Sequence, residues 1–340
     1  MNLANTASKS LLAPDRLAQL RGALQWTSLS KQGAYILQNL LVPLIAIALC
    51  LGLWGAAAKN IQTSLGALPG PAQVWEQAVS LLDEHQAERA KADAFYARQD
   101  ERNAQKLAED PSAEVRERSY TGKPTFIDQI ITSLVTVATG FIIASLIAIP
   151  IGIACGMSTT LYTALNPLIQ IFKPVSPLAW LPLVTMVVSA LYVSENPMFA
   201  KSFVTSAITV TLCCLWPTVI NTTVGVASVS KDLLNVSRVL RLGWFTKTVK
   251  IVLPSAIPMM FTGMRLSLSI GWMVLIAAEM LAQNPGLGKF VWDEFQNGSS
   301  NSLARIMVAV FTIGLVGFAL DRGMLLLQRR VSWDKTAVLR

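Results

Sequence analysis

The sequence has few charged residues, almost no histidine and few cysteines. Charged residues make up 14% of the 340 residues, well below the roughly 25% that is usual for a soluble domain. Because His85 is the only histidine, a metal or catalytic cluster built from histidines is excluded. The four cysteines stand in apolar stretches without the spacing of metal ligands. No Walker phosphate loop is present either, because PGLGKF has the Gly-Lys pair without the upstream glycine. These absences argue against a soluble enzyme, and any ATP that is used has to be bound by another chain.

The sequence is instead rich in long apolar segments. Hydrophobic residues are 53% of the chain, and several segments reach the roughly 20 residues that a membrane-crossing helix needs. They cover residues 39–58, 126–157, 161–193, 203–224, 257–281 and 303–327. We therefore expect an all-α polytopic membrane protein with six transmembrane helices. A cleaved signal peptide is the alternative for the first segment, with Ala56-Ala57-Ala58 as the cleavage site, but the long polar stretch 1–38 before it favours an uncleaved helix.

The formal net charge of +8 could indicate a nucleic-acid partner. No motif that combines basic and aromatic residues is present, however, and the basic residues cluster beside the apolar segments. Such clusters fix membrane topology, because short cytoplasmic loops are rich in Lys and Arg. The loop 224–250 and the tail after Leu320, which includes 329–340, are basic, so both are predicted to be cytoplasmic together with 1–38. We expect membrane lipid around the chain and no nucleic acid.

Residues 59–124 interrupt the apolar pattern and are predicted to lie outside the cytoplasm, in the periplasm. Gln73 to Glu109 has helical propensity and is dense in charges of both signs. We interpret it as an extramembrane helix. A solvated spacer and a docking surface or lid for an external binding protein are both compatible with this composition.

A short amphipathic helix is predicted over Val229–Leu242, between the fourth and fifth apolar segments. Its polar residues recur at three- and four-residue steps opposite a stripe of Leu and Val, which is the period of a helix. Ser230 is a good N-cap, and Gly243 is expected to end the helix in a left-handed conformation. We expect the basic face of this helix to dock to a soluble partner.

The loop 229–250 resembles the cytoplasmic coupling loop of binding-protein-dependent ABC importer permeases. In those proteins a Glu-Ala-Ala-like triplet is followed four residues later by Gly and closed by Leu-Pro; here the positions read Ser237-Arg238-Val239, Gly243 and Leu253-Pro254, without the acidic residue. The resemblance implies contact with a partner ATPase. The residues assigned to this coupling are Lys231, Asp232, Asn235, Ser237, Arg238, Arg241, Gly243, Trp244, Leu253 and Pro254.

Within this class, the sequence of residues 126–330 resembles the nitrate branch of the nitrate, sulfonate, taurine and bicarbonate permeases. The resemblance is carried by NVSRVLRLG, by VLPSAIPMMFTGMRLSL and by GWMVLIAAEMLAQNPGLGKFVWDEFQN. It implies the type I permease fold, a five-helix core at 125–328 preceded by an N-terminal helix. It also implies a non-enzymatic import subunit for a small inorganic anion, nitrate or nitrite, in a bacterial inner membrane. Sulfonate or taurine, cyanate and bicarbonate remain alternative substrates.

The same resemblance implies the partners. They are a second copy of the chain, cytoplasmic ATP-binding cassette subunits that bind ATP and magnesium, and a periplasmic or lipid-anchored substrate-binding protein; no cofactor is expected in this chain. A self-sufficient secondary transporter is the more distant alternative. Such transporters repeat broken spans in both halves, whereas the prolines here crowd the third segment without an equivalent in the sixth.

Four residues inside the predicted spans are candidates for the transport pathway. A charged side chain at a helix centre costs about 2.5–3.5 kcal/mol on insertion scales, so its presence suggests a function. The candidates are Lys173, Arg265, Trp272 and Glu279. Each has a structural alternative: the two cations could reach for an interface or a neighbouring carboxylate, Trp272 could simply pack, and Glu279 could bond a neighbouring backbone. The prolines around Lys173 predict a broken helix. Residues 284–297 are too polar to span the membrane, and their Pro-Gly-Leu-Gly start resembles the short re-entrant outer segment of this permease class.

Overall fold

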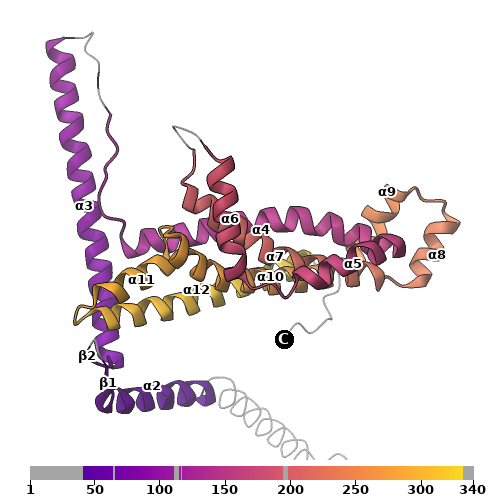
Figure 1. The fold of residues 1–340 in the computed structure, drawn as a ribbon, viewed down its shortest axis with the longest axis horizontal. Coiled ribbons are helices and arrows are strands. Elements are labelled where there is room, and N and C mark those ends of the chain that lie inside the picture. Colours follow the sequence, from indigo (N-terminus) through magenta and orange to yellow (C-terminus); the bar gives the residue numbers. More distant parts are fainter. Residues whose placement is uncertain (1–40, 64–65, 111–114, 116, 194–197, 332–340) are drawn as a thin grey trace, which may run out of the picture. The chain divides into compact units, whose positions relative to one another are not determined.

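The computed structural model describes residues 41–63, 66–110, 115, 117–193 and 198–331. The chain divides into two compact units, Met1–Ala72 and Gln73–Arg340. The predictions for 1–38, and most of those for the tail 329–340, lie outside the described residues. Figure 1 shows the elements with the labels used below.

The first unit contains a single apolar helix and a small hairpin. Helix α2 (Val42–Asn60) is long and apolar enough to cross a membrane. Strands β1 (Gln62–Thr63) and β2 (Gly66–Ala67) pair antiparallel after it. The indole nitrogen of Trp54 donates to the carbonyl of Pro69 over 3.1 Å, which ties the hairpin back to the helix. The expected first span, 39–58, thus corresponds to α2 with its ends shifted slightly.

The second unit is a helical bundle. Its helices, in chain order, are α3 (Pro71–Glu109), α4 (Phe126–Met157), α5 (Thr159–Phe172), α6 (Pro177–Leu191), α7 (Lys201–Ala227), α8 (Lys231–Val239), α9 (Trp244–Lys247), the π-turn η2 (Thr248–Val252), α10 (Leu253–Ala282), α11 (Leu287–Asn297) and α12 (Ser302–Val331). In the described chain, five helical segments could each span a membrane, or six if α5 and α6 form one broken span. The expected all-α polytopic fold is confirmed.

Helix α7 forms the centre of the bundle and packs against α4 and α10 (Figure 1). Small residues allow the close approach: a Cβ at Gly140 would lie 2.7 Å from the carbonyl oxygen of Ala207, and one at Gly271 would lie 2.4 Å from the Sγ of Cys214. The hydroxyl of Thr211 donates across the contact to the Gly140 carbonyl over 3.1 Å. Glycine at contacts and short polar bridges are how helices associate inside a membrane, where no hydrophobic force drives them together.

Helices α5 and α6 meet at a bend of 99°, at the prolines that predicted a broken helix. Pro174 has no N–H to continue the ladder of α5, and Pro177 stands in the first turn of α6, where no such bond is needed. Ser176 caps α6 by accepting a hydrogen bond from the N–H of Leu178 over 3.3 Å. The broken third segment is therefore confirmed, with Lys173 as the first residue after α5.

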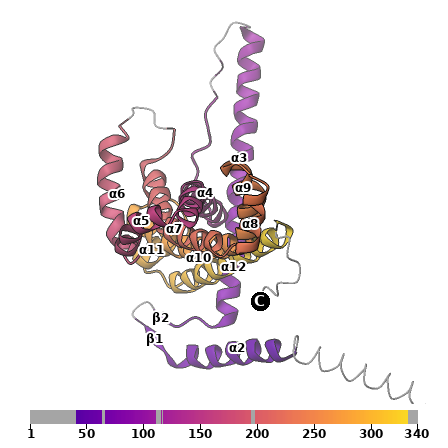
Figure 2. The same ribbon diagram turned by 90° about the vertical axis from the view of Figure 1, so that its right-hand side faces the viewer.

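The second unit has two opposite ends. One carries α8 and α9, and we call it the loop end; the other carries α3 and α11, and we call it the arm end (Figures 1 and 2). The arm consists of α3 and residues 117–125, which lead into α4. Because α4, α7, α10 and α12 run between these ends, the loop and the arm stand on opposite sides of the apolar bundle.

The arm is held together along its length. The N–H of Arg118 donates to Gln99 Oε1 over 2.9 Å, and the N–H of Tyr120 donates to the hydroxyl of Tyr96 over 3.1 Å. The Tyr120 hydroxyl in turn donates to Glu88 Oε1 over 2.7 Å. The helix expected at 73–109 is thus confirmed, and Arg118 and Tyr120 of the chain after it are hydrogen-bonded to it.

The base of the arm is joined to the bundle by charged contacts. Arg89 pairs with Asp128 in the first turn of α4, and His85 Nδ1 is hydrogen-bonded to Thr125 Oγ1 over 2.7 Å. Arg305, near the start of α12, pairs with Glu84 of α3 and also with Glu294 of α11 over 3.2 Å. Arg305 therefore joins three helices at the arm end.

Candidate functional site

The loop end presents helix α8 with most of its surface uncovered. Ser230 caps the helix, accepting from the N–H of Leu233, and Asp232 lies in the first turn, where the helix dipole favours an anion. Ser237 is buried, and Leu234 packs against the apolar cluster around Val252. Through these two side chains α8 rests on the bundle, and its remaining faces point outward.

The outward faces are both apolar and basic. The exposed apolar side chains include Val239, at 82% exposure, and Trp244 and Phe245 of the following turn, at 65% and 72%. The other members of this docking face are Lys231, Leu233, Asn235, Val236, Arg238, Leu240 and Arg241. The sequence predicted docking through the basic face; the structure leaves the Leu and Val stripe exposed beside it. An exposed apolar patch rimmed by charge is typical of a protein interaction site.

Gly243 does not end α8 as the sequence predicted. The left-handed residue is Arg241, with φ of 48°, whereas Gly243 has φ of −61° and precedes α9 as its N-cap. A Cβ at Gly243 would meet nothing within 4 Å. The turn is closed two residues earlier than expected, by the N–H of Leu242 donating to the Ser237 carbonyl over 3.0 Å. Left-handed arginine is uncommon, so the sequence offered no signal for it.

Leu253 and Pro254 begin the long helix α10, directly after the π-turn η2. A π-turn has a wider hydrogen-bond register than an α-helix, and it lets the chain pass from the loop into the span at a proline that cannot donate. The Thr248 hydroxyl bonds back to the Trp244 carbonyl over 2.8 Å and holds the turn. The coupling residues expected from the sequence thus run from α8 to the start of α10, with Ser237 buried and Leu253 and Pro254 partly buried.

Three of the four pathway candidates make specific structural contacts. Arg265 on α10 donates to Asp321 on α12 through Nε, at 3.0 Å from Oδ1, and through one terminal nitrogen, at 2.9 and 3.1 Å from the two carboxylate oxygens. Asp321 is therefore the neighbouring carboxylate that the structural alternative for Arg265 requires, and the contact is bidentate. Trp272 is buried and donates to the Ile313 carbonyl over 3.0 Å, which is a packing role.

Glu279 lies fully buried at the arm end of α10. It accepts hydrogen bonds from the Ser133 hydroxyl over 2.7 Å and from the N–H of Gly288 over 2.8 Å. Ser133 itself accepts from the N–H of Leu287 over 2.9 Å. Glu279 therefore anchors the first turn of α11 to α4 and α10, as the structural alternative expects, and Ser133 is a partner that the sequence did not indicate.

Lys173 has different surroundings. It is exposed in the break between α5 and α6, and within the described residues no carboxylate pairs with it. Two cavities share it as a lining residue: a first cavity of about 380 Å³ between α4, α5 and α7, and a second of about 260 Å³ between the break, α7 and α10. Among the described residues, neither cavity is lined by Asp or Glu.

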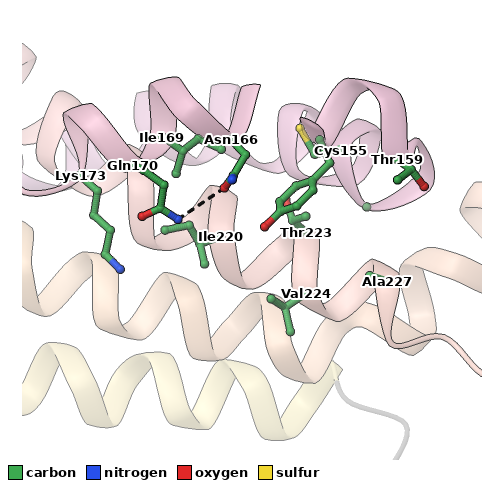
Figure 3. Close-up of a pocket in the computed structure, with 12 residues that line it drawn as sticks. Cys155, Thr159, Asn166, Ile169, Gln170, Lys173, Ile220, Thr223, Val224 and Ala227 are labelled. Carbon is green, nitrogen blue, oxygen red and sulfur yellow. Dashed lines mark hydrogen bonds between the residues drawn. The ribbon is translucent and has the colours of Figure 1, made fainter. Parts of the chain in front are cut away.

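The first cavity is lined by polar side chains from one face of α5. Figure 3 shows Asn166, Gln170 and Lys173 extending from α5 toward α7, with the amide of Gln170 bonded to Asn166 Oδ1 over 3.4 Å. Thr159 and Tyr162 belong to the same lining. These five residues follow one another at steps of three and four, so the helical period of the sequence could have identified them. In the described chain, no group of three His, Cys, Asp or Glu side chains could hold a metal ion.

With this geometry established, comparison with known proteins identifies the family. The model of the family described as "Binding-protein-dependent transport system inner membrane component" matches residues 148–333. The chain belongs to this family. It is a membrane-spanning permease subunit of an ABC importer and not an enzyme, with ATP hydrolysis carried out by partner subunits.

Relatives of this importer permease differ in their substrates. The nitrate import permease protein NrtB of Synechocystis sp. is 38% identical over 203 residues, covering 60% of this chain and 69% of that protein. The bicarbonate transport system permease protein CmpB of the same organism is 38% identical over 205 residues, covering 60% and 68%. The taurine permease TauC of Escherichia coli is 29% identical over 234 residues, covering 65% and 78%.

A solved structure supports the fold. The inward-facing MetNI methionine ABC transporter matches with a TM-score of 0.53 and 12% identity, over 61% of this chain and 96% of that chain. The prediction of a type I importer permease fold is therefore confirmed.

Proposed function

We propose that this chain is the permease of an ATP-driven, binding-protein-dependent importer of a small inorganic anion, with nitrate or nitrite as the substrate. The observation that carries the ATP-driven part is the docking face on α8 and α9, where bulky apolar side chains stand exposed beside basic ones. An exposed apolar patch rimmed by charge marks a protein interaction site. The nitrate assignment draws its support from the relatives named for nitrate import.

Bicarbonate is the second candidate substrate. Permeases named for bicarbonate transport are 38% and 39% identical to this chain, as similar as those named for nitrate. Both ions are small planar oxyanions with one negative charge, so a pathway suited to one is chemically close to the other. Sulfonate or taurine and cyanate are further alternatives.

The remaining organisation follows from charge and family. The loop end is basic at Arg238 and Arg241 and, at the end of α12, at Arg329 and Arg330, so we assign it to the cytoplasm with both termini. The permease core is 125–328, and the arm within 59–124 then lies outside a bacterial inner membrane. Two copies of the chain would enclose the path. The ATPases, which bind ATP and magnesium, would lie on the cytoplasmic side, and the substrate-binding protein would lie on the outer side of the membrane.

Reconstitution would test this proposal. The permease, its ATPases and its binding protein are placed in liposomes, and accumulation of labelled nitrate is measured with and without internal ATP. We expect uptake that requires ATP and the binding protein, and that stops when the ATPase catalytic glutamate is removed. Uptake without the ATPases would favour a secondary transporter, and ATP-dependent uptake of bicarbonate but not nitrate would reassign the substrate.

A further inference from the structure

Lys173, exposed in the break between α5 and α6, and Arg265, partly buried on α10, are two cations with opposite electrostatic surroundings. Arg265 is neutralised by the bidentate contact with Asp321. Lys173 has no carboxylate partner in the described chain, and the two cavities that it lines contain no acidic side chain there. A cation placed in apolar surroundings needs water, a lipid headgroup or another anion, because its charge is costly to leave unsolvated.

The position of Lys173 places this free charge between the two cavities. Ile220 of α7 lines both cavities as well, and it stands seven residues before Ala227, which puts it about 10 Å along the helix from the loop end. The second cavity continues away from the loop end to Leu266 and Ile270. Lys173 and Ile220 are thus the lining residues that the two cavities share.

We propose that Lys173, together with the side-chain amides of Asn166 and Gln170, forms a subsite for a small oxyanion in transit through the membrane. This inference rests on the proposed function and names the place where the permease itself holds the anion. The anion would exchange part of its hydration shell for the ammonium and amide N–H groups, and it would leave along the polar lining of α5 toward the loop end.

The chemistry suits transit better than tight binding. A pathway must bind an ion well enough to admit it and weakly enough to release it. One lysine is a single mobile point charge with three donors, whereas a guanidinium offers a rigid fork that fits an oxyanion through two bonds. The amides add donors without adding charge. Cavities of about 380 and 260 Å³ also leave room for an anion that keeps some of its water.

A phospholipid headgroup could supply the same oxyanion chemistry. The flexible stem of a lysine can lie along apolar surface while its ammonium reaches the membrane interface. We commit to the transported anion, because polar side chains line the first cavity for several turns from Lys173 toward the loop end. Measurements of transport and of bound lipid, made on the same variants, distinguish the two sources.

The first test compares substitutions in the complete reconstituted complex. We expect Lys173→Met to lower nitrate uptake by about tenfold or more, and Lys173→Arg to keep a large part of it. Lys201→Met is the matched control, since Lys201 is an exposed lysine at the start of α7 that lines neither cavity, and it should transport like the wild type. Co-purification with the ATPases checks that each variant assembles.

The second test restores the charge after assembly. Lys173→Cys is made in a background without Cys155 and Cys213, because these native thiols line the two cavities. Reaction with aminoethyl methanethiosulfonate rebuilds a cationic side chain of similar length and should recover uptake, whereas the sulfonatoethyl reagent should not. Nitrate should also slow the reaction at position 173, which is a binding measurement that does not depend on transport.

The outcomes separate this subsite from the proposed function. If the wild-type complex imports nitrate and Lys173→Met imports it equally well, the subsite is wrong. Equal recovery with both thiol reagents would make Lys173 a space-filling residue, and loss of bound anionic lipid with unchanged uptake would make it a lipid anchor; either result overturns the proposal. If the wild type imports no nitrate, the proposed substrate fails, and protection of Lys173→Cys by nitrate or bicarbonate still decides the subsite.

Discussion

Arg265 and Asp321 hold each other across α10 and α12, with less than a third of either side chain exposed. The pair is therefore partly screened by solvent, and removing one partner costs less than it would in a fully buried pair. Arg322 lies 4.0 Å from the same carboxylate and offers only a weak substitute. Removing one partner leaves the other charge poorly satisfied, whereas removing both leaves no charge behind.

This pair gives a prediction that separates structure from transport. We expect Arg265→Met to lower the free energy of unfolding by about 2 kcal/mol, because Asp321 loses its bidentate donor. The double variant Arg265→Met with Asp321→Leu should recover much of that loss. Thermal unfolding and nitrate uptake are measured on the single and double variants. A double variant that is stable and yet cannot transport nitrate would indicate that Arg265 acts in the anion pathway.

Glu88 and Tyr120 supply a second prediction at the residue scale. The hydrogen bond from the Tyr120 phenol, with help from Lys91, lowers the pKa of Glu88 below its usual 4.5, and the same bond raises the pKa of Tyr120 above 10.0. A carboxylate with a lowered pKa stabilises the folded arm at neutral pH, and this contribution is lost as the pH falls through that pKa. For Tyr120 the contribution is present below its usual pKa and is lost as the pH rises through the raised value.

The arm should accordingly loosen at acid pH. We expect the amide of Tyr120 to exchange faster below pH 4.5, after correction for intrinsic rates, because protonated Glu88 accepts the phenol bond less well. Glu88→Gln keeps an acceptor oxygen but cannot titrate, so its acid profile should be flat. Lys91→Met is the control for the weaker neighbouring charge. An unchanged acid profile in Glu88→Gln would assign the loosening to another group.

At the scale of helices, the sequence predicted the elements better than their environment. The apolar runs predicted α4 residue for residue, and the prolines predicted the break before α6, because both depend on local composition. The partner of Arg265 lies 56 residues away, and that of Glu279 lies 146 residues away, so no local pattern could reveal them. The polar residues of α5 follow the helical period of the sequence, but among them only Lys173 was predicted to belong to the pathway, because it is charged.

Helix α8 shows why a face cannot be assigned from amphipathicity alone. The apolar stripe of an amphipathic helix is usually buried, yet here only Leu234 and Ser237 reach the bundle, and the rest of the stripe is exposed. An apolar face can be covered by the core of its own protein, or it can be covered by a separate partner protein. The helical period alone does not say which of the two will do so.

The exposed stripe predicts how the permease holds its ATPase. We expect Val239→Asp to weaken co-purification with the ATPase subunits by about tenfold or more, which corresponds to roughly 1.4 kcal/mol. The stability of the isolated permease should change by no more than about 0.5 kcal/mol, because Val239 touches little else. Leu107→Asp is the matched control, an exposed apolar residue on α3. If the Val239→Asp variant binds the ATPase subunits as well as the wild type does, the apolar stripe is not part of the interface.

At the scale of the whole molecule, the arm end is a connected structure. Arg305 links α3, α11 and α12, and Glu279 with Ser133 links α11, α10 and α4. A force applied to α3 would therefore reach the helices that surround the bundle core through ionic and hydrogen-bonded contacts. This connectivity fixes α3 to the bundle, and the docking interpretation of 59–124 stays a prediction beside the solvated-spacer interpretation.

The last prediction concerns which side of the membrane each end occupies. The arm end and the loop end lie at opposite ends of the spans, so they must face different compartments (Figure 1). We expect a membrane-impermeant thiol reagent to label Gln105→Cys, on the arm, in intact spheroplasts, and to label Asn235→Cys, on α8, only after permeabilisation. Both positions are exposed, so accessibility within the protein is matched. A background without Cys50, the exposed native thiol on α2, removes the competing signal. Labelling of Asn235→Cys in intact spheroplasts would invert the topology, and because the basic loop end could then not meet a cytoplasmic ATPase, it would also contradict the import mechanism.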